Sequence, residues 1–360
     1  MAPNESAAAA TLTDIESRID LAVRLYDHYE SLGEVKHYYG VLAIYALVRA
    51  GKTTGDPALV ARCERILRRF PAEVEHPRYN FQIYAIGGLG QAYALAMGMM
   101  PDRADLVREH AEELMAAPRD AEGILTMPGE PGDKVWIDTA MAASPYLMYA
   151  GLALDEPAYL DEAVRQTVLM YDLLLDPDNG LLHQCINFVG PGLLSEDHWS
   201  RGNGWGYFAL AELVAELPAA HHGRPGIERR FRDLSEALLP HQAASGLWRQ
   251  EIPLATSWEE SSGSGLIVYG FAVGIRTGLL TGCRWQDAVD RGVAGLIRTS
   301  INADGSIENS CPGTLCPGDG VEKGTVRAYV ELRAPYRDEP HGCAPLMLAL
   351  IEAAVHEESA

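Results

Sequence analysis

Residues 198–205, HWSRGNGW, place aromatic, cationic and amide side chains between glycines. Tryptophan rings stack on the C–H faces of sugars, while arginine and asparagine bind hydroxyl and acidic groups. The apolar run that follows predicts a helix, and these residues are an unusual way to begin one. Gly202 and Gly204 predict an unusual turn and a close approach of the backbone to a neighbour. The stretch therefore indicates a binding site for a sugar ring.

Polar and aromatic residues of the same kind open five other predicted helices. The openings read KHYY at 36–39, RYN at 78–80, VWID at 135–138, WEESSGSG at 258–265 and DEPHG at 338–342. If these helices run in one direction, a single mouth collects Tyr39, Asn80, Trp136, Asp138, Trp199, Arg201, Asn203, Trp205 and His341, with His183 from a nearby turn. Converging helix N-termini would also favour an anion at this mouth.

Each residue has an ordinary structural explanation as well. Asp138, Asn203, Ser261 and Asp338 are good helix N-caps, and a tryptophan such as Trp205 is usually mostly buried. Capping does not require tryptophan, however, and core packing does not require an arginine between glycines. The cluster as a whole favours a ligand site.

The helices that must position these residues are of two alternating kinds. Six are amphipathic and charged, as expected of an outer layer, and they cover 13–30, 56–70, 103–116, 157–175, 226–241 and 285–299. Six are apolar nearly all round and rich in alanine and glycine, as expected of buried helices, and they cover 36–51, 80–98, 136–154, 202–217, 262–280 and 341–355. The alternation predicts an all-α protein, an (α/α)6 barrel of six inner and six outer helices.

Four short turns support this repeat. They contain Gly123, Gly180, Gly246 and Gly305, and each follows an outer helix and precedes the next inner one. We expect them to form β-turns or hairpins at one end of the barrel.

Composition narrows the classes of function and location. The formal net charge is −21, which argues against nucleic acid and anionic membranes as partners. No run reaches the ~18 apolar residues of a membrane span. Without a secretory leader, the six scattered cysteines predict reduced thiols and a cytoplasmic location. We expect one catalytic domain over 1–360, with 1–10 as a flexible N-terminus, and no metal or other cofactor; the oligomeric state is left open.

Several segments together resemble a known family. HWSRGNGW resembles the signature of the unsaturated rhamnogalacturonyl hydrolases, glycoside hydrolase family 105, which are relatives of the unsaturated glucuronyl hydrolases of family 88. VWIDTAMAASPYLM, GLLHQ, SWEESSGSGLIVYG and DEPHGCAPLMLAL resemble other motifs of that family in the same order. The resemblance covers residues from about 36 to 356.

This resemblance implies a fold, a substrate and residue roles. The fold is an (α/α)6 barrel, and the substrate is a Δ4,5-unsaturated uronic acid at the non-reducing end of an oligosaccharide left by a polysaccharide lyase. Asp138 is then the acid/base, and Arg201 and His183 line the sugar pocket. Asn80 stands where the family commonly has an aspartate. The first inner helix of the family often opens with tryptophan, whereas this one has His37, Tyr38 and Tyr39.

The implied reaction is hydration of an enol ether, in which one carboxyl group can donate and accept a proton. We expect burial to raise the pKa of Asp138 despite the nearby helix N-terminus, and the Arg201 fork to bind the substrate carboxylate.

The residues leave two alternative functions open. An inverting glycosidase on saturated sugars would pair Asp138 with Glu259 or Glu260. A sugar epimerase could use His183 with His341, and the same barrel could also bind sugars without turnover.

Overall fold

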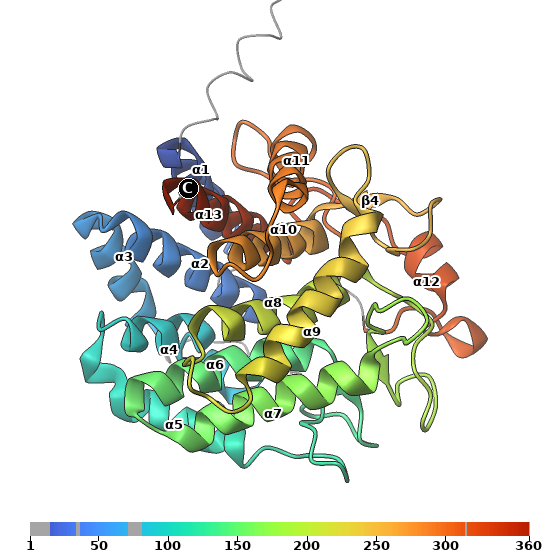
Figure 1. Ribbon diagram of the computed structural model, residues 1–360, viewed down its shortest axis with the longest axis horizontal. Helices are drawn as coiled ribbons and strands as arrows, with labels where there is room; N and C mark the ends of the chain where they lie inside the picture. Colours follow the sequence, from blue (N-terminus) through green and yellow to red (C-terminus); the bar gives the residue numbers. More distant parts are fainter. Residues whose placement is uncertain (1–14, 34–36, 71–80, 314, 360) are drawn as a thin grey trace, which may run out of the picture.

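The protein is described here by a computed structural model, which covers residues 15–33, 37–70, 81–313 and 315–359. Helices dominate, and strands occur only as two-residue pieces within these ranges (Figure 1). Asn80 and the predicted flexible residues 1–10 lie outside the described residues.

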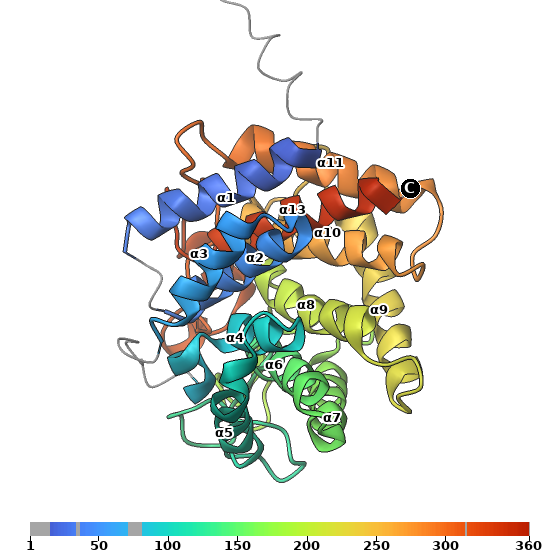
Figure 2. The same ribbon diagram turned by 90° about the vertical axis from the view of Figure 1, so that its left-hand side faces the viewer.

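The helices form two concentric rings. The inner helices are α2 (Tyr38–Thr54), α4 (Gly88–Ala96), α6 (Asp138–Leu154), α8 (Ser200–Glu216), α10 (Ser261–Arg276) and α13 (Cys343–Ser359). The outer helices are α1 (Ile15–Ser31), α3 (Pro57–Leu67), α5 (Ala104–Met115), α7 (Pro157–Leu174), α9 (Arg224–Leu238) and α11 (Cys283–Ser300). Each inner helix contacts the next, and α13 contacts α2, so the inner ring closes. Figure 2 shows α1 lying beside α13, which joins the two ends of the chain.

The predicted (α/α)6 barrel is therefore confirmed. Its inner helices are buried nearly all round, as their apolar composition requires. Glycines let them approach closely: a Cβ atom on Gly263 would lie 2.5 Å from the backbone of Ser200, so α10 could not touch α8 there with a larger residue. A short helix, α12 (Val326–Glu331), lies outside the predicted twelve.

The second inner helix differs from its prediction. The periodicity predicts one helix over 80–98, but the structure has a 3-10 turn, η2 (Gln82–Ile86), followed by α4. Gly87 separates them and Gly88 begins α4, with φ angles of +95° and +51° that glycine adopts most easily. The glycine pair therefore interrupts the helix predicted over 80–98.

Short hairpins and turns lie at one end of the barrel. All four predicted turn glycines have positive φ, which confirms them as tight turns; isolated bridges such as Leu175 with Leu182 flank three of them. Two antiparallel pairs lie nearby: β1 (Val135–Trp136) pairs with β2 (Cys185–Ile186), and β3 (Trp248–Arg249) with β4 (Glu259–Glu260). Two inner helices begin directly beside this layer, since α6 follows β1 and α10 follows β4.

Three further 3-10 turns are present: η3 (Pro101–Arg103), η4 (Leu239–His241) and η5 (Gly320–Glu322). Across the described residues, no helix combines the length and apolar character that a membrane span needs. All six cysteines are unpaired, and Cys283 alone among them is exposed.

Candidate active site

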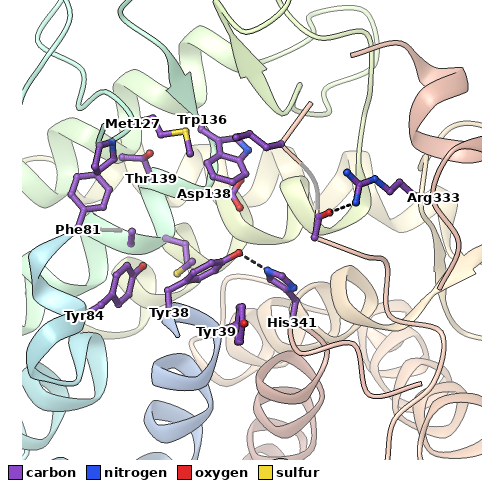
Figure 3. A pocket seen from close by; sticks show the side chains of 15 residues that line it. Tyr38, Tyr39, Phe81, Tyr84, Met127, Trp136, Asp138, Thr139, Arg333 and His341 are labelled. Atoms are coloured by element: carbon purple, nitrogen blue, oxygen red, sulfur yellow. Dashed lines mark hydrogen bonds between the residues drawn. The ribbon is translucent and has the colours of Figure 1, made fainter. Parts of the chain in front are cut away.

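A cavity of about 390 Å³ lies at the N-terminal ends of the inner helices α2 and α6 (Figure 3). This volume is within the range typical of small-molecule sites. Its walls are largely aromatic and apolar, and they consist of Tyr38, Tyr39, Phe81, Tyr84, Met127, Pro128, Trp136, Asp138, Thr139, Met141, Ala142, Gly313, Leu315, Arg333 and His341. Four of the residues predicted for the site therefore meet here: Tyr39, Trp136, Asp138 and His341.

Asp138 is the carboxyl group of the cavity wall. It is the first residue of α6, and β1 fixes its approach because the Ile137 N–H donates to the carbonyl of Gln184 at 2.9 Å. The side chain is 8% exposed, and Oδ2 has no hydrogen-bond partner. Burial raises the pKa of Asp138 to about 8, although the positive charge of Arg201 opposes this shift. The expectation that burial wins is confirmed in direction, and the group holds a proton at neutral pH.

A second polar group on the same wall joins three side chains. The Tyr38 hydroxyl lies 2.5 Å from Nε2 of His341, and Nδ1 of His341 lies 2.6 Å from Oε1 of Glu339 (Figure 3 shows the first contact). Glu339 also accepts from the backbone N–H groups of His341 and Gly313, at 3.0 and 3.2 Å. Burial lowers the pKa of His341, while the neighbouring Glu339 opposes that shift.

Arg201 lies in the wall behind the cavity and is 1% exposed. Nη1 donates to the carbonyl of Cys311, and Nη2 donates to the carbonyl of Pro312 at 3.0 Å. Its guanidinium also stacks on the Trp199 ring, 4.7 Å from the ring centroid. Arg201 thus holds the loop that carries Gly313, and it is not among the residues that line the cavity.

The other predicted residues of HWSRGNGW are buried and have structural contacts. Asn203 receives a hydrogen bond from the N–H of Leu182 at 2.8 Å and returns one to the Leu182 carbonyl at 2.9 Å, which joins a rim turn to α8. Trp199 donates to Sγ of Cys311 at 3.1 Å. Trp205 belongs to the core, and its indole N–H lies near enough to the Asp138 carboxyl to oppose the rise in the pKa of that group, although it makes no hydrogen bond of ordinary geometry. The unusual turn predicted for this stretch is wrong, because its glycines lie within regular helix.

His183 lies in a separate polar group at the rim. Its ring centroid is 4.8 Å from that of His198, whose Nε2 lies 2.9 Å from Oδ2 of Asp176. Possible ligand atoms of these three residues lie within 4.8 Å of one another, as do those of the more exposed Asp161, His221 and His222. These are the described residues best placed to hold a metal ion, and sequence reasoning overlooked both groups because their members come from distant segments.

Sequence reasoning also missed several cavity residues. Phe81, Tyr84 and Met127 are ordinary apolar residues whose spacing carries no signal of a site. Arg333 is the one permanent cation among the lining residues, and its Nη1 donates to the carbonyl of Gly313 at 3.0 Å. Its proximity to the DEPHG motif is the only sequence feature that could have drawn attention to it.

Comparison with known proteins identifies the class. The sequence model of Glycosyl Hydrolase Family 88 matches residues 20–356, so the chain belongs to this family of glycoside hydrolases. The relationship predicted from the motifs, to family 105 and its relative family 88, is thereby confirmed.

Particular relatives point to similar enzymes. The chain is 31% identical over 166 residues to an unsaturated 3S-rhamnoglycuronyl hydrolase of Formosa agariphila, covering 43% of this chain and 44% of the relative. It is 27% identical over 207 residues to the unsaturated rhamnogalacturonyl hydrolase YesR of Bacillus subtilis, covering 56% and 58%. The matches thus span about half the length of these relatives.

Solved structures share the fold at lower identity. A possible GH105 member from Salmonella enterica superposes with a TM-score of 0.80 at 21% identity, covering 99% of this chain and 100% of the other. The unsaturated glucuronyl hydrolase of Bacillus sp. GL1 superposes with a TM-score of 0.72 at 16% identity, covering 94% and 96%.

Proposed function

We propose that this protein removes a Δ4,5-unsaturated uronic acid from the non-reducing end of oligosaccharides made by polysaccharide lyases. One observation carries the proposal: Asp138 is a buried, protonated carboxyl group with an unpartnered oxygen in an aromatic cavity. The names of the curated relatives agree with it.

The chemistry follows from the state of Asp138. Its carboxyl proton goes to C4 of the enol ether, and positive charge develops at C5 and the ring oxygen. Water adds at C5, and the hemiketal that results opens and releases the aglycone. An acid with a pKa near the working pH is suited to this first transfer, which is typically worth about 10²- to 10⁴-fold in rate.

Binding of the sugar falls to the cavity walls. Trp136 and Tyr39 offer ring faces for its C–H groups, and His341 lines the wall with both ring nitrogens engaged by Tyr38 and Glu339. Arg201 acts from behind the wall, where its charge offsets that of the substrate carboxylate at short range. We retain Asn80, His183, Trp199, Asn203 and Trp205 as supports of the sugar pocket, with the contacts described above for the last four.

The alternative activities have less support. A saturated glycosidase needs a second carboxylate, but Glu260 is used as the helix cap of α10, where its oxygens accept from the N–H groups of Ser262 and Gly263 at 2.7 and 2.5 Å. An epimerase would pair His183 with His341, and only His341 lines the cavity.

We further propose that the chain acts as a single catalytic domain in the cytoplasm. The closed double ring supports the first point, and six unpaired cysteines support the second. The substrates to test first are unsaturated uronyl–rhamnose disaccharides, following the names of the relatives.

The test is an assay of lyase digests from pectic and sulfated algal polysaccharides. The ultraviolet absorbance of the unsaturated uronate should fall on addition of the protein, and a saturated disaccharide of the same sugars should remain intact. Cleavage of the saturated disaccharide, or no loss of absorbance with any digest, would contradict the proposal.

A further inference from the structure

The Tyr38 hydroxyl has an orientation fixed by its neighbours. Glu339 is buried and accepts four hydrogen bonds, from Ser310, His341 twice and Gly313. Burial raises its pKa, but interaction with His341, the charge of Arg201 and the Ser310 hydrogen bond outweigh burial and lower the pKa to about 2. Because an ionised Glu339 can only accept a hydrogen bond, Nδ1 of His341 carries the ring proton and donates to it. The lone pair of the ring is then on Nε2, which accepts the Tyr38 O–H at 2.5 Å.

This arrangement turns the oxygen of Tyr38 into an acceptor. The Tyr38 hydroxyl donates its hydrogen to His341, so the lone pairs of the Tyr38 oxygen are available to a donor in the cavity. Figure 3 shows the Tyr38 hydroxyl and the Asp138 carboxyl pointing toward one another across the cavity. The negative charge of Asp138 is also the second largest reason, after burial, why the pKa of Tyr38 is raised. A water molecule between these two groups would meet an acid on one side and an acceptor on the other.

We propose that Tyr38, His341 and Glu339 form a proton relay that takes the proton of the attacking water and returns it to Asp138. The inference rests on the proposed hydration reaction. Tyr38 would be a catalytic residue, since it contacts the water, while His341 and Glu339 act through it as positioning residues and His341 also stores the proton.

The protons balance over one turnover. Asp138 first gives its proton to C4, and the electrons of the C4=C5 double bond form the new C4–H bond. The water oxygen then bonds to C5 while one of its protons moves to the oxygen of Tyr38 and the Tyr38 proton moves to Nε2 of His341. Afterwards Nε2 returns its proton to Tyr38, and the Tyr38 hydroxyl gives its proton to the Asp138 carboxylate. Water has been added, and every side chain is restored.

The acidities suit these steps. Water that attacks a positively charged carbon loses its proton easily, so a weak base is sufficient. Burial keeps His341 neutral, and therefore ready to accept, while Glu339 stabilises the imidazolium that forms. With the relay, Asp138 protonates C4 and Tyr38 takes the proton of the water. Asp138 then need not reach both C4 and the water from one position.

Two substitutions separate a relay from simple positioning. Tyr38→Phe removes the acceptor with little change in shape. His341→Gln can still accept the Tyr38 hydrogen bond through its amide oxygen, but it cannot take up a proton. We expect each to lower kcat about 10- to 100-fold with KM changed by less than about threefold. The double variant should lose no more than about the larger single loss, because both remove one pathway.

The control is Tyr26→Phe on the outer helix α1, which removes a buried hydroxyl that, unlike that of Tyr38, has no hydrogen-bond partner. It should leave kcat and KM unchanged. Thermal unfolding of each variant verifies folding. Wild-type kcat in both Tyr38→Phe and His341→Gln, losses confined to KM, or a loss in Tyr38→Phe alone would overturn the relay. Failure of the wild-type protein to consume any unsaturated substrate would instead contradict the proposed function.

Discussion

The two ends of the barrel interior each bury a carboxyl group, with opposite surroundings. Glu212, near the C-terminal end of α8, accepts hydrogen bonds from the hydroxyls of Tyr45, Tyr149 and Tyr269 at 2.7, 2.8 and 2.5 Å. Asp138, at the N-terminal end of α6, has an oxygen with no partner. Tyr149 and Asp138 share α6, where they are separated by about 16 Å along the helix.

The same contrast holds for two buried arginines, Arg49 and Arg201. Arg49 lies 2.6 Å from Glu352, and Arg276 lies 2.5 Å from the other oxygen of that carboxylate. Arg201 contacts its nearest carboxylate, Glu339, only at 3.7 Å, and it donates hydrogen bonds to two loop carbonyls and to the Ser262 hydroxyl. One end of the barrel thus satisfies its charges internally, as a structural core must. The other leaves proton donors and acceptors directed at a cavity, which is expected where a substrate supplies the missing partners.

The largest expected effect is the loss of the catalytic proton. Asp138→Asn retains the shape but cannot donate to C4, so kcat should fall at least about 100-fold while the melting temperature is retained. Steady-state kinetics and thermal unfolding measure the two quantities. Asp155→Asn, the same substitution just beyond the other end of α6, is the matched control and should retain turnover. Normal turnover by folded Asp138→Asn would reduce Asp138 to a structural residue.

At the end of the barrel that holds Glu212, we expect a substitution to reduce stability and leave turnover unchanged. Glu212→Gln removes the charge that faces Arg49 and the three tyrosines, and it should lower the free energy of unfolding by about 2 to 3 kcal/mol. Turnover by the folded fraction should remain normal. Glu216→Gln, one turn further along α8, is the control and should destabilise less, because Glu216 is only half-buried. Equal destabilisation by both would show that the tyrosine contacts of Glu212 contribute little.

Arg201→Lys tests the arginine of the active end. Lysine keeps the charge but cannot reach two loop carbonyls as a fork, so kcat/KM should fall about tenfold, or ~1.4 kcal/mol. The comparison variant is Arg49→Lys, which should reduce stability and leave kcat/KM of the folded protein unchanged. Wild-type kinetics for Arg201→Lys would show that the loop at 311–313 needs no such anchor.

The smallest effect is expected at the cavity mouth. Arg333 is exposed, lines the cavity and donates a hydrogen bond to the Gly313 carbonyl, so its remaining N–H groups can meet an acidic group on the sugar beyond the uronate. Arg333→Gln should raise KM about threefold for such a substrate, since exposed charge pairs are worth less than ~1 kcal/mol. A neutral aglycone should show no change. Arg232→Gln on the outer helix α9 is the control, and equal KM changes for both substrates would assign Arg333 no preference.

The sequence predicts the barrel well because helix periodicity and alternating composition are local properties. It also predicts Asp138, since an aspartate that follows tryptophan at the start of an apolar helix is both buried and directed at the mouth. It could not predict that Arg201 binds the carbonyls of residues 311 and 312 and is not among the residues that line the cavity, because that depends on where this loop folds back onto α8.

The pairing of Tyr38 with His341 joins residues 303 positions apart, which only closure of the ring brings together. The sequence does not predict that Arg333 lines the cavity, for the same reason. Asn203 shows a different limit, since its residue type suits a sugar contact, a cap or a tie to a turn equally well, and only the structure selects the last.

The protonation state of Asp138 decides the proposed function most directly, and difference infrared spectroscopy of the wild-type protein against Asp138→Asn measures it. Because burial raises its pKa to about 8, the carboxyl C=O band should be present at pH 6 and 7 and should disappear as the pH rises through about 8. The value of kcat/KM should fall over the same range, since the acid form is the active one. A carboxylate band that persists down to about pH 4, the ordinary value for aspartate, would contradict the central claim that this end of the barrel holds a protonated acid.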